Sequence, residues 1–559
     1  MTSPIEARVL DILASFTGAQ VDVAHLLCDR HRPDAVALTF VDTDHSVRTM
    51  TFGELAEQSR RVAVVLADRG VGRGDRVATL MGKSPELLAV LVGIWRLGAV
   101  YVPLFTAFAP ATVSARLTDA AVAVVVADDD QAGKVPAGPW QLIVNGAHES
   151  AAILNEQTSS ITDAAAAEQG SVAVGGDGSL VHMFTSGTTG KPKAVVHPVR
   201  YAAGWQSYLE FGLGVEADSV FWCGADPGWA YGLYTAIVAP LAAGVGTILV
   251  RGGFTAQTTW RVLKNLQVTD FAAAPTVYRG LLADEAGVPQ GLVLRRLSSA
   301  GEPLTPEVNE WARQALGLQV HDHYGQTELG MPIGYAHHPL LEHPILEGAM
   351  GAALPGWTMT VLRPDSDIVA ESGEIGQLAV DVAASVLMTF TGYADNAAAT
   401  AARFRGTGEE QIEDAGGREQ RRYFLTGDIA AIDADGLIRF SSRDDDVILM
   451  AGYRIGPFDI ESVLLTHPAV VECAVVAAPD RVRGEVVEAY VVLAANQTGD
   501  DTSIAGELQQ WVKTNYAAHA YPRRIHVVDA LPKTPSGKIQ RAELRRQRRE
   551  QLSTESASS

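Results

Sequence analysis

Uniformly apolar runs alternate with amphipathic stretches from the N-terminus to the region near Arg443. The runs VAVVVA at 122–127 and GTILV at 246–250 are short and rich in β-branched residues, which predicts buried strands. Apolar residues recur at helical spacing over 54–70 and 86–99, each with a closing glycine, which predicts amphipathic helices. Strands that alternate with helices in this way form parallel βαβ units. We therefore expect an α/β fold with a large N-terminal domain of stacked βαβ sheets.

A smaller unit begins near Arg443, where the pattern changes. An acidic cluster is followed by a short strand, a turn and a helix, and then by two strand patterns and another helix. This region is long enough to fold around a core of its own. We therefore predict a large domain over 1–442, a small mobile α+β domain over 443–548 and a disordered tail over 549–559.

The final helical pattern, RAELRRQRRE from Arg541, carries five arginines. A run of like charges is typical of a solvent-exposed helix. Chain ends that nothing ties down are usually poorly ordered. We therefore predict a solvated helix end and a frayed tail here, and we do not expect a nucleic-acid-binding surface.

One segment has the length and polarity of a membrane span. Residues Trp229–Val250 contain no charged residue and are numerous enough to cross a bilayer as a helix. Pro240, Gly244 and Gly246 interrupt that helix near its middle. The sequence therefore favours a buried helix followed by a buried strand, without membrane insertion.

Composition and charge narrow the function classes. The chain has 559 residues, of which 47% are hydrophobic, and a net charge of −21. That charge argues against a protein that coats nucleic acid or an anionic membrane. The three cysteines follow no metal-binding or disulfide spacing, and the N-terminus carries charges where a signal peptide needs an apolar core. We therefore predict a cytoplasmic protein.

The stretch TSGTTGKPK at 185–193 has the composition of a phosphate-binding loop. Its glycines free backbone N–H groups to face an anion, and its lysines add positive charge. It is not a Walker A loop, because Thr185 stands where that motif requires glycine and Pro192 follows Lys191. The candidate nucleotide-binding residues of this loop are Thr185, Ser186, Gly187, Thr188, Thr189, Gly190, Lys191 and Lys193.

Five further motifs occur in a specific order along the chain. They are YGQTE at 324–328, TGD at 426–428, SRDDD at 442–446, GYR at 452–454 and PKTPSGKIQR at 532–541. Together with the loop they resemble the adenylate-forming superfamily of acyl-CoA synthetases, adenylation domains and luciferases. The resemblance runs from about Val21 to Arg545. It is closest to the medium-chain acyl-CoA synthetases, with the acetyl-CoA synthetases next.

This resemblance implies a two-step reaction and a set of residues for it. ATP with Mg²⁺ activates a carboxylic acid as an acyl-adenylate, and coenzyme A then displaces AMP to give a thioester. The implied catalytic residues are Lys538, Thr327 and Glu328, and Glu328 offers the hard oxygen ligand that Mg²⁺ prefers. The implied adenine pocket consists of Gly301, Glu302, Pro303, Asp322, His323, Tyr324, Gly325 and Gln326.

The remaining implied contacts divide between the ribose, the phosphates and coenzyme A. Asp428 would accept the ribose hydroxyls, and Arg443 and Arg454 would reach the ribose and phosphate. The small domain would rotate about Asp445, presenting Lys538 to ATP in one pose. In the other pose it would present coenzyme A with contacts from Gly452, Tyr453, Arg483, Tyr521 and Arg523. Ser442, Leu449 and Ala451 depart from the family's usual residues, and Ala451 makes the coenzyme A contacts less secure than the ATP contacts.

The implied acyl pocket predicts the size of the acid. Its residues match Trp229, Tyr231, Gly232, Ala300 and Gly325. Acetyl-CoA synthetases resemble one another in having tryptophan at the position of Gly325, and a glycine there would leave a tunnel. We therefore expect a medium-chain, branched or small aromatic monocarboxylic acid to be preferred over acetate.

Several alternatives stay open. The chain could be an acetyl- or propionyl-CoA synthetase, an adenylation enzyme that loads a carrier protein, a luciferase-like oxidative enzyme, or a nucleotide-binding protein without turnover. The sequence also leaves open a homo-oligomeric state and a lysine acyltransferase that acts on Lys538. Histidines are frequent between 321 and 343, but their scatter fits no metal-ligand spacing.

Overall fold

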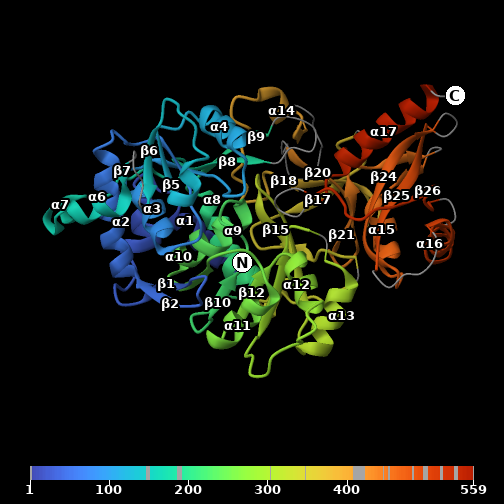
Figure 1. The fold of residues 1–559 in the computed structure, drawn as a ribbon, viewed down its shortest axis with the longest axis horizontal. Helices are drawn as coiled ribbons and strands as arrows, with labels where there is room; N and C mark the ends of the chain where they lie inside the picture. The colour runs from blue at the N-terminus through green and yellow to red at the C-terminus, as the bar shows by residue number, and fades with distance from the viewer. Residues whose placement is uncertain are drawn as a thin grey trace.

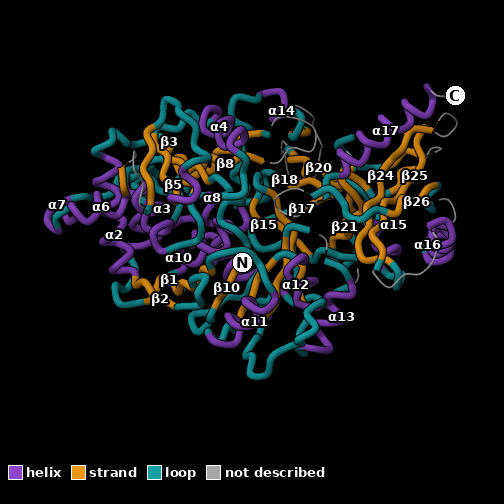
Figure 2. The backbone as a smooth tube through the Cα atoms, viewed as in Figure 1, coloured by secondary structure: helices purple, strands orange, loops and turns teal. Residues whose placement is uncertain are grey.

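The structure is a computed structural model, and the part of the chain it describes is drawn in Figures 1 and 2. The described residues are 3–146, 152–185, 192–302, 304–346, 348–364, 366–406, 422–444, 446–450, 453–480, 484–494, 501–516, 520–533 and 539–557.

Two large sheets form the N-terminal part of the molecule, as the blue to yellow ribbon of Figure 1 shows. The seven-stranded sheet has the order β7 (Ala152–Ile153), β6 (Gln141–Asn145), β5 (Val124–Asp128), β3 (Arg76–Leu80), β4 (Val100–Pro103), β8 (Ser179–Thr185) and β9 (Lys193–Pro198). The nine-stranded sheet has the order β16 (Ala352–Ala353), β15 (Gly330–Gly334), β14 (Val320–Gln326), β13 (Arg296–Ala300), β12 (Asp270–Ala273), β10 (Phe221–Cys223), β11 (Thr247–Val250), β1 (Val36–Val41) and β2 (Val47–Thr51). Both are parallel in their centres and antiparallel at an edge.

Two smaller sheets follow in the chain. One contains β17 (Met359–Leu362), β18 (Gly376–Asp381), β20 (Tyr423–Ile432), β19 (Phe404–Arg405) and β21 (Ile438–Arg443), and it is antiparallel throughout. The other contains β23 (Tyr453–Ile455), β22 (Ile448–Met450), β25 (Gly484–Leu493), β24 (Val470–Asp480) and β26 (Arg524–Val527). The last of these sheets lies with its helices at one end of the molecule (Figure 1).

Helices surround and separate the sheets (Figure 2). In the first two hundred and fifty positions they are α1 (Pro4–Ser15), η1 (His25–Asp29), α2 (Phe52–Ala67), α3 (Pro85–Arg96), α4 (Pro110–Asp119), α5 (Asp129–Ala132), α6 (Leu154–Ser160), α7 (Asp163–Glu168), α8 (Tyr201–Ser207), η2 (Tyr208–Gly212), α9 (Ala230–Leu233), η3 (Tyr234–Val238) and α10 (Ala239–Ala243). The later ones are α11 (Ala256–Asn265), α12 (Pro275–Leu282), α13 (Pro306–Ala315), η4 (Pro339–Leu341), α14 (Ala397–Ala401), α15 (Pro457–Leu465), α16 (Asp501–Asn515) and α17 (Arg541–Ala557).

The elements read from hydrophobic periodicity are confirmed. Strands β5 and β11 occupy the two predicted apolar runs, and helices α2 and α3 occupy the two amphipathic stretches. Helix α2 begins at a capping box, in which the Thr51 side chain and Glu54 satisfy each other's backbone N–H groups. The predicted α/β fold class is therefore correct.

The uncharged segment Trp229–Val250 is divided as expected. It forms the short helices α9, η3 and α10, then a left-handed turn at Gly244 and the buried strand β11. Among the residues that the structure describes, we find no helix with both the length and the apolar character needed to cross a membrane.

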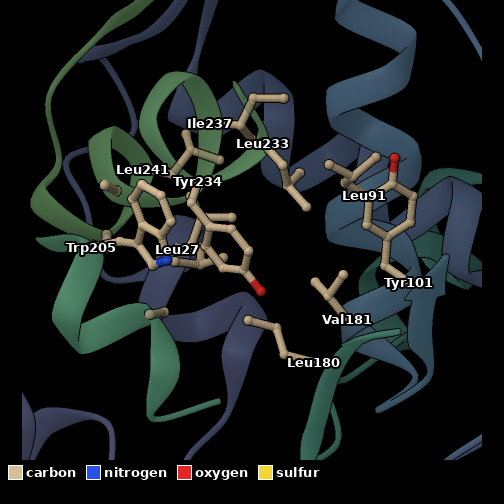
Figure 3. Packing of buried hydrophobic residues seen from close by; sticks show 14 of the residues in the cluster. Leu27, Leu91, Tyr101, Leu180, Val181, Trp205, Leu233, Tyr234, Ile237 and Leu241 are labelled. Atoms are coloured by element: carbon tan, nitrogen blue, oxygen red, sulfur yellow. The ribbon is translucent and has the colours of Figure 1, made fainter. Parts of the chain in front are cut away.

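The main apolar core packs helices α8 to α10 against the seven-stranded sheet. Figure 3 shows Trp205 and Tyr234 side by side, facing Tyr101 of β4 and Val181 of β8. The Trp205 and Tyr234 rings stack at 5.1 Å. This packing fixes the base of the β8–β9 hairpin, whose connection is the glycine-rich loop.

A separate apolar cluster lies within the last sheet and its helices. It includes Ile448, Leu464, Val475, Val491 and Leu508, all almost fully buried. A second core of this kind is what an independent small domain requires. The domain boundaries at 442 and 548 themselves stay predictions.

The predicted solvated helix end is exposed on one face only. Arg541 donates to both oxygens of Glu461 at 3.1 and 2.6 Å, Arg545 pairs with Asp446, and Arg548 donates to Glu488 at 2.7 and 3.2 Å. The three arginines follow a spacing of four and then three, so they share one face of α17. That face packs against the sheet, with Leu544 buried between the charged groups.

Helix α17 continues to Ala557, into the segment 549–559 that the sequence predicts to be a disordered tail, and residues 558–559 lie outside the described residues. Arg546 on the exposed face pairs with Glu543 and with Glu550, and such pairs along a helix stabilise it modestly. The paired arginines on the opposite face connect the helix to the rest of the last sheet and its helices.

The ion pair between Arg548 and Glu488 should matter for the stability of the last sheet. Burial would raise the pKa of Glu488, but the hydrogen bonds from His526 and Arg548 lower it below its usual value. Arg548→Met should therefore leave a buried, poorly compensated carboxylate and cost about 3 kcal/mol of local stability. Hydrogen exchange of the β24 and β25 amides would measure the loss.

The neighbouring Arg549→Met is a matched control, since Arg549 is exposed. It should change the same exchange rates by less than about 0.5 kcal/mol. Equal effects from the two substitutions would contradict a structural role for Arg548.

Candidate active site

The glycine-rich loop connects β8 to β9. Thr185 and Lys193 are opposite each other at the loop end of this hairpin, where the Thr185 hydroxyl donates to the Lys193 carbonyl oxygen at 3.4 Å. The candidate residues Ser186, Gly187, Thr188, Thr189, Gly190 and Lys191 lie outside the described residues, so their contacts stay predictions. The hairpin nevertheless fixes where the loop begins and ends.

Thr327 lies in the turn between β14 and β15, and two side chains bind its carbonyl oxygen. Its carbonyl oxygen accepts hydrogen bonds from His197 Nε2 at 2.8 Å and from the Tyr201 hydroxyl at 2.9 Å. Because His197 Nε2 donates, its Nδ1 must accept, and the Tyr234 hydroxyl is 2.8 Å away. Burial lowers the pKa of His197 to about 3, so this histidine is neutral at physiological pH.

Sequence reasoning missed this support. His197 follows Val195 at a two-residue spacing on β9, so both side chains point to the same buried face. The available sequence signal for this support was a single histidine within an apolar strand. The Thr327 carbonyl group to which it binds is 130 residues away in the chain.

Glu328 comes next in the chain and is 7% exposed. Its Oε1 accepts from the Tyr393 hydroxyl at 2.6 Å. The Lys193 ammonium lies 4.9 Å from the centre of the Tyr393 ring. Burial lowers the pKa of Lys193, as do Arg403 and Arg443, while Glu328 opposes the shift. The structure therefore brings the candidate residues Lys193 and Glu328 to one place.

Asp428 lies on β20 and links that strand's sheet to Tyr324 and Gln326 of β14. Its Oδ2 accepts from the Tyr324 hydroxyl and from Gln326 Nε2, the latter at 2.9 Å. Its Oδ1 is 3.2 Å from the Arg443 guanidinium, which the pairing of β20 with β21 places opposite. Burial raises the pKa of Asp428, against the influence of Arg443 and Tyr324. Four candidate residues from three chain segments thus form one network.

The other described residues of the implied adenine pocket each have a different environment. Gly301 has a φ of +100°, which a side chain would disfavour. Glu302 is already paired with Arg279 at 2.9 Å, and Pro303 lies outside the described residues. Burial raises the pKa of Asp322 to about 8, and its Oδ1 has no hydrogen-bond partner within the described ranges.

His323 is engaged on both ring nitrogens. Nδ1 lies 2.8 Å from the Tyr208 hydroxyl, and Nε2 lies 2.9 Å from the Tyr335 carbonyl oxygen. The His321 and His337 rings stack at 3.6 Å nearby, so these histidines gather rather than scatter. In the part of the chain that is described, no group of histidine, cysteine and acidic residues has the arrangement of a metal site.

Aromatic rings surround the candidate acyl residues. Trp229 lies 5.5 Å from Phe105 and 5.9 Å from Phe108, measured between ring centres. The Tyr231 hydroxyl is 3.2 Å from that of Tyr208. Gly232 and Ala300 are small for different reasons: Ala300 is buried in β13, while a Cβ on Gly232 would lie 2.0 Å from the Asp226 carbonyl oxygen.

The backbone around Gly325 leaves no free space in the direction of a side chain at that position. A Cβ on Gly325 would lie 2.2 Å from the Gly330 carbonyl oxygen and 2.3 Å from Met331 Sδ. The register of β14 against β15 shifts between Tyr324 and Gln326, so the backbones approach closely at this irregularity. Glycine is therefore required by the backbone, and the Met331 side chain occupies the space.

The candidate residues of the C-terminal part are described only in part. Tyr453 and Arg454 begin β23, while Asp445, Gly452, Arg483 and Lys538 lie outside the described residues. The Tyr521 ring is flanked by Arg523 at 3.9 Å and Lys513 at 4.0 Å. This cluster combines positive charge with an aromatic face, which suits an anionic, planar ligand.

Comparisons with known proteins agree with this arrangement. A family model described as "AMP-binding enzyme" matches residues 28–393, and one described as "AMP-binding enzyme C-terminal domain" matches residues 459–538. The chain is 33% identical to the acetyl-coenzyme A synthetase of Bacillus subtilis, over 94% of this chain and 90% of that protein. It is 32% identical to the mitochondrial acyl-coenzyme A synthetase ACSM3 of Mus musculus, over 91% and 86%.

A solved structure extends the comparison to three dimensions. The crystal structure of an acyl-CoA synthetase from Brucella canis is 40% identical and superposes with a TM-score of 0.72, covering 98% of this chain and 97% of that one.

The close approach at Gly325 generates a prediction. Gly325→Ala should push β14 away from β15, lower the thermal stability and reduce activity on all acids alike. Thermal unfolding and a comparison of rates across acid lengths would measure this. Gly506→Ala is the control, because a Cβ there meets no atom within 4 Å. A Gly325→Ala protein of normal stability that selectively favours short acids would restore the tunnel interpretation.

Proposed function

We propose a reaction for this chain from the family to which it belongs, the AMP-binding enzymes. As a member of that family it is an AMP-forming acid–thiol ligase, with ATP and coenzyme A as substrates. We propose that it activates a medium-chain, branched or small aromatic monocarboxylic acid as the acyl-adenylate and transfers the acyl group to coenzyme A. Pyrophosphate leaves in the first step and AMP in the second.

One observation supports this proposal above the others. Lys193, Glu328 and Asp428 come from three distant segments and meet around the guanidinium groups of Arg403 and Arg443. Attack of a carboxylate on the α-phosphate requires cations near the phosphates, a carboxylate for the ribose and a fixed geometry between them. This cluster offers all three at the end of the glycine-rich hairpin.

We propose that Glu328 also holds Mg²⁺. Its carboxylate is buried and interacts electrostatically with Lys193, and carboxylate oxygens are the ligands that Mg²⁺ prefers. When bound, the metal would neutralise charge on the leaving pyrophosphate. The carbonyl oxygen of Thr327 is fixed by His197 and Tyr201, which would keep the neighbouring Glu328 in one position.

The second half-reaction would use the small domain. We propose that Tyr521 with its flanking cations Lys513 and Arg523 meets the coenzyme A nucleotide. Lys538 would serve the first half-reaction and move away in the second, through rotation about Asp445. Gly452 and Tyr453 would then border the path of the thiol. These assignments rest on the resemblance of the motifs.

We propose that the Met331 side chain, rather than an open tunnel, determines which length of acid is preferred. Its thioether fills the position to which a Gly325 side chain would point, and methionine is unbranched and adaptable. We propose that Met331 can move aside for a longer chain, which an indole could not. A short acid such as acetate is the second candidate, because Met331 reduces the space as the structure stands.

A panel of acids tests the function. The purified chain with ATP, Mg²⁺ and coenzyme A should form AMP and an acyl-CoA thioester, faster with medium, branched or aromatic acids than with acetate. Lys538→Ala should lose adenylate formation and retain thioester formation from supplied acyl-adenylate. Thioester formation only on a carrier protein, or oxygen consumption by the adenylate, would support the competing functions instead.

Met331→Ala tests the proposed acyl wall. Removing the thioether should extend the preferred acid by one or two methylenes, each worth about 0.8 kcal/mol, so kcat/KM for the longer acid should rise by roughly 10-fold relative to the shorter one. Met50→Ala is the control, because Met50 is equally buried but lies on β2 at the far edge of the nine-stranded sheet. An unchanged length profile in Met331→Ala would exclude Met331 from the acyl wall.

A further inference from the structure

A chain of hydrogen bonds leads from Glu328 into a part of the molecule that the motifs do not cover. The Tyr393 hydroxyl donates to Glu328 Oε1 at 2.6 Å, and Arg403 Nε donates to the Tyr393 hydroxyl oxygen at 3.2 Å. The direction is fixed, because a guanidinium has only donors and therefore obliges the tyrosine oxygen to accept. The single tyrosine proton is then available for Glu328 alone.

The segment that carries Tyr393 is held firmly. The Tyr393 backbone N–H donates to the Thr400 hydroxyl at 2.9 Å, and the N–H of Ala394 donates to the Ala194 carbonyl oxygen on β9 at 2.9 Å. The Tyr393 side chain is 5% exposed. A ring fixed at both its backbone and its hydroxyl can hold Glu328 in one rotamer.

Arg403 is fixed as well. Its Nη1 donates to the Leu425 carbonyl oxygen at 3.3 Å, and its own carbonyl oxygen accepts from the Leu425 N–H at 2.7 Å. A Cβ on Gly427 would lie 2.4 Å from Arg403 Nη1, so the TGD motif leaves room for this guanidinium. The same arginine acts electrostatically on Asp428. It thereby links the proposed metal carboxylate to the proposed ribose carboxylate.

We infer that Tyr393 and Arg403 are positioning residues for the adenylation half-reaction. Tyr393 holds Glu328 by Oε1 and leaves Oε2 to face the metal of ATP–Mg²⁺, since Tyr393 is the carboxylate's only hydrogen-bond partner among the described residues. Arg403 orients the tyrosine proton toward Glu328. This inference rests on the proposed function, because it assigns Glu328 a metal to hold.

Supporting groups behind a metal ligand commonly contribute 10- to 100-fold in metal affinity, although they never touch the metal. The competing explanation is that Tyr393 serves only to pack the segment before α14, against Phe390 at 5.1 Å and beneath Lys193. Tyr393→Phe separates the two explanations, because it removes the hydroxyl and keeps the ring.

The test measures metal binding directly. Mn²⁺ would be titrated into the full-length protein with α,β-methylene-ATP, which cannot be cleaved at the α-phosphate, and bound Mn²⁺ would be followed by electron paramagnetic resonance. Tyr393→Phe should weaken Mn²⁺ binding about 10-fold or more. The Mg²⁺ concentration for half-maximal acid-dependent pyrophosphate release should rise by a similar factor, while thioester formation from supplied acyl-adenylate should not change.

Tyr278→Phe is the matched control. It also removes a buried hydroxyl, which donates to the carbonyl oxygens of Phe271 and Ser298, but it lies on α12, away from Glu328. Its Mn²⁺ affinity should stay within twofold of the wild-type value. Arg403→Lys keeps the charge but loses the guanidinium fork, and it should weaken Mn²⁺ binding in the same direction, so it decides the question if Tyr393→Phe does not fold.

A folded Tyr393→Phe protein with wild-type Mn²⁺ affinity would overturn the inference. Failure of the wild-type chain to release pyrophosphate with any acid would instead overturn the proposed function. The Mn²⁺ titration would still decide whether Tyr393 positions a metal ligand.

Discussion

The two hydrogen bonds to the Thr327 carbonyl oxygen join the two large sheets at the proposed nucleotide site. His197 belongs to β9 of the seven-stranded sheet, whereas Thr327 follows β14 of the nine-stranded sheet. Tyr201 stacks on His197 at 4.0 Å and donates to the same oxygen, so the joint is buried and rigid. Because burial keeps His197 neutral, the bonds persist over the physiological pH range. Strand β9 and the turn after β14 are held together through this contact.

The charge of the site differs from that of the whole chain. The molecule carries a net charge of −21, yet Lys193, Arg403 and Arg443 gather at the proposed nucleotide site. Glu328 and Asp428 in their midst are buried, and a buried carboxylate needs compensation. The cations serve first to compensate these two groups. They also create a positive electrostatic potential at this site, opposite in sign to the net charge of the chain, which can still attract phosphate groups.

The sequence predicted those features that depend on neighbours along the chain. Periodicity was sufficient for β5 and α2, because strand and helix spacing are local properties. It could not show the close backbone approach at Gly325, since the shifted register of β14 and β15 is a property of a strand pair. It failed for Arg548 and missed Tyr393, whose partners Glu488 and Glu328 are 60 and 65 residues away. Charged runs and single tyrosines carry no sign of such distant partners.

The residues on either side of the proposed hinge, Asp445, have different partners. The N–H of Asp444 donates to the Gly427 carbonyl oxygen at 2.9 Å, which ties it to the sheet of β20 and β21. Asp446 instead pairs with Arg545 of α17, which is anchored through Arg548 to the last sheet.

The Asp446 side chain is thus held by α17, while its backbone N–H donates to the Arg443 carbonyl oxygen at 3.1 Å, on the other side of Asp445. In the proposed rotation about Asp445, the ion pair would move with the small domain, and the bond to Arg443 would have to break or rearrange. The arginines of α17 therefore do more than stabilise a helix: they extend the proposed small domain up to Asp446, the residue after the proposed hinge.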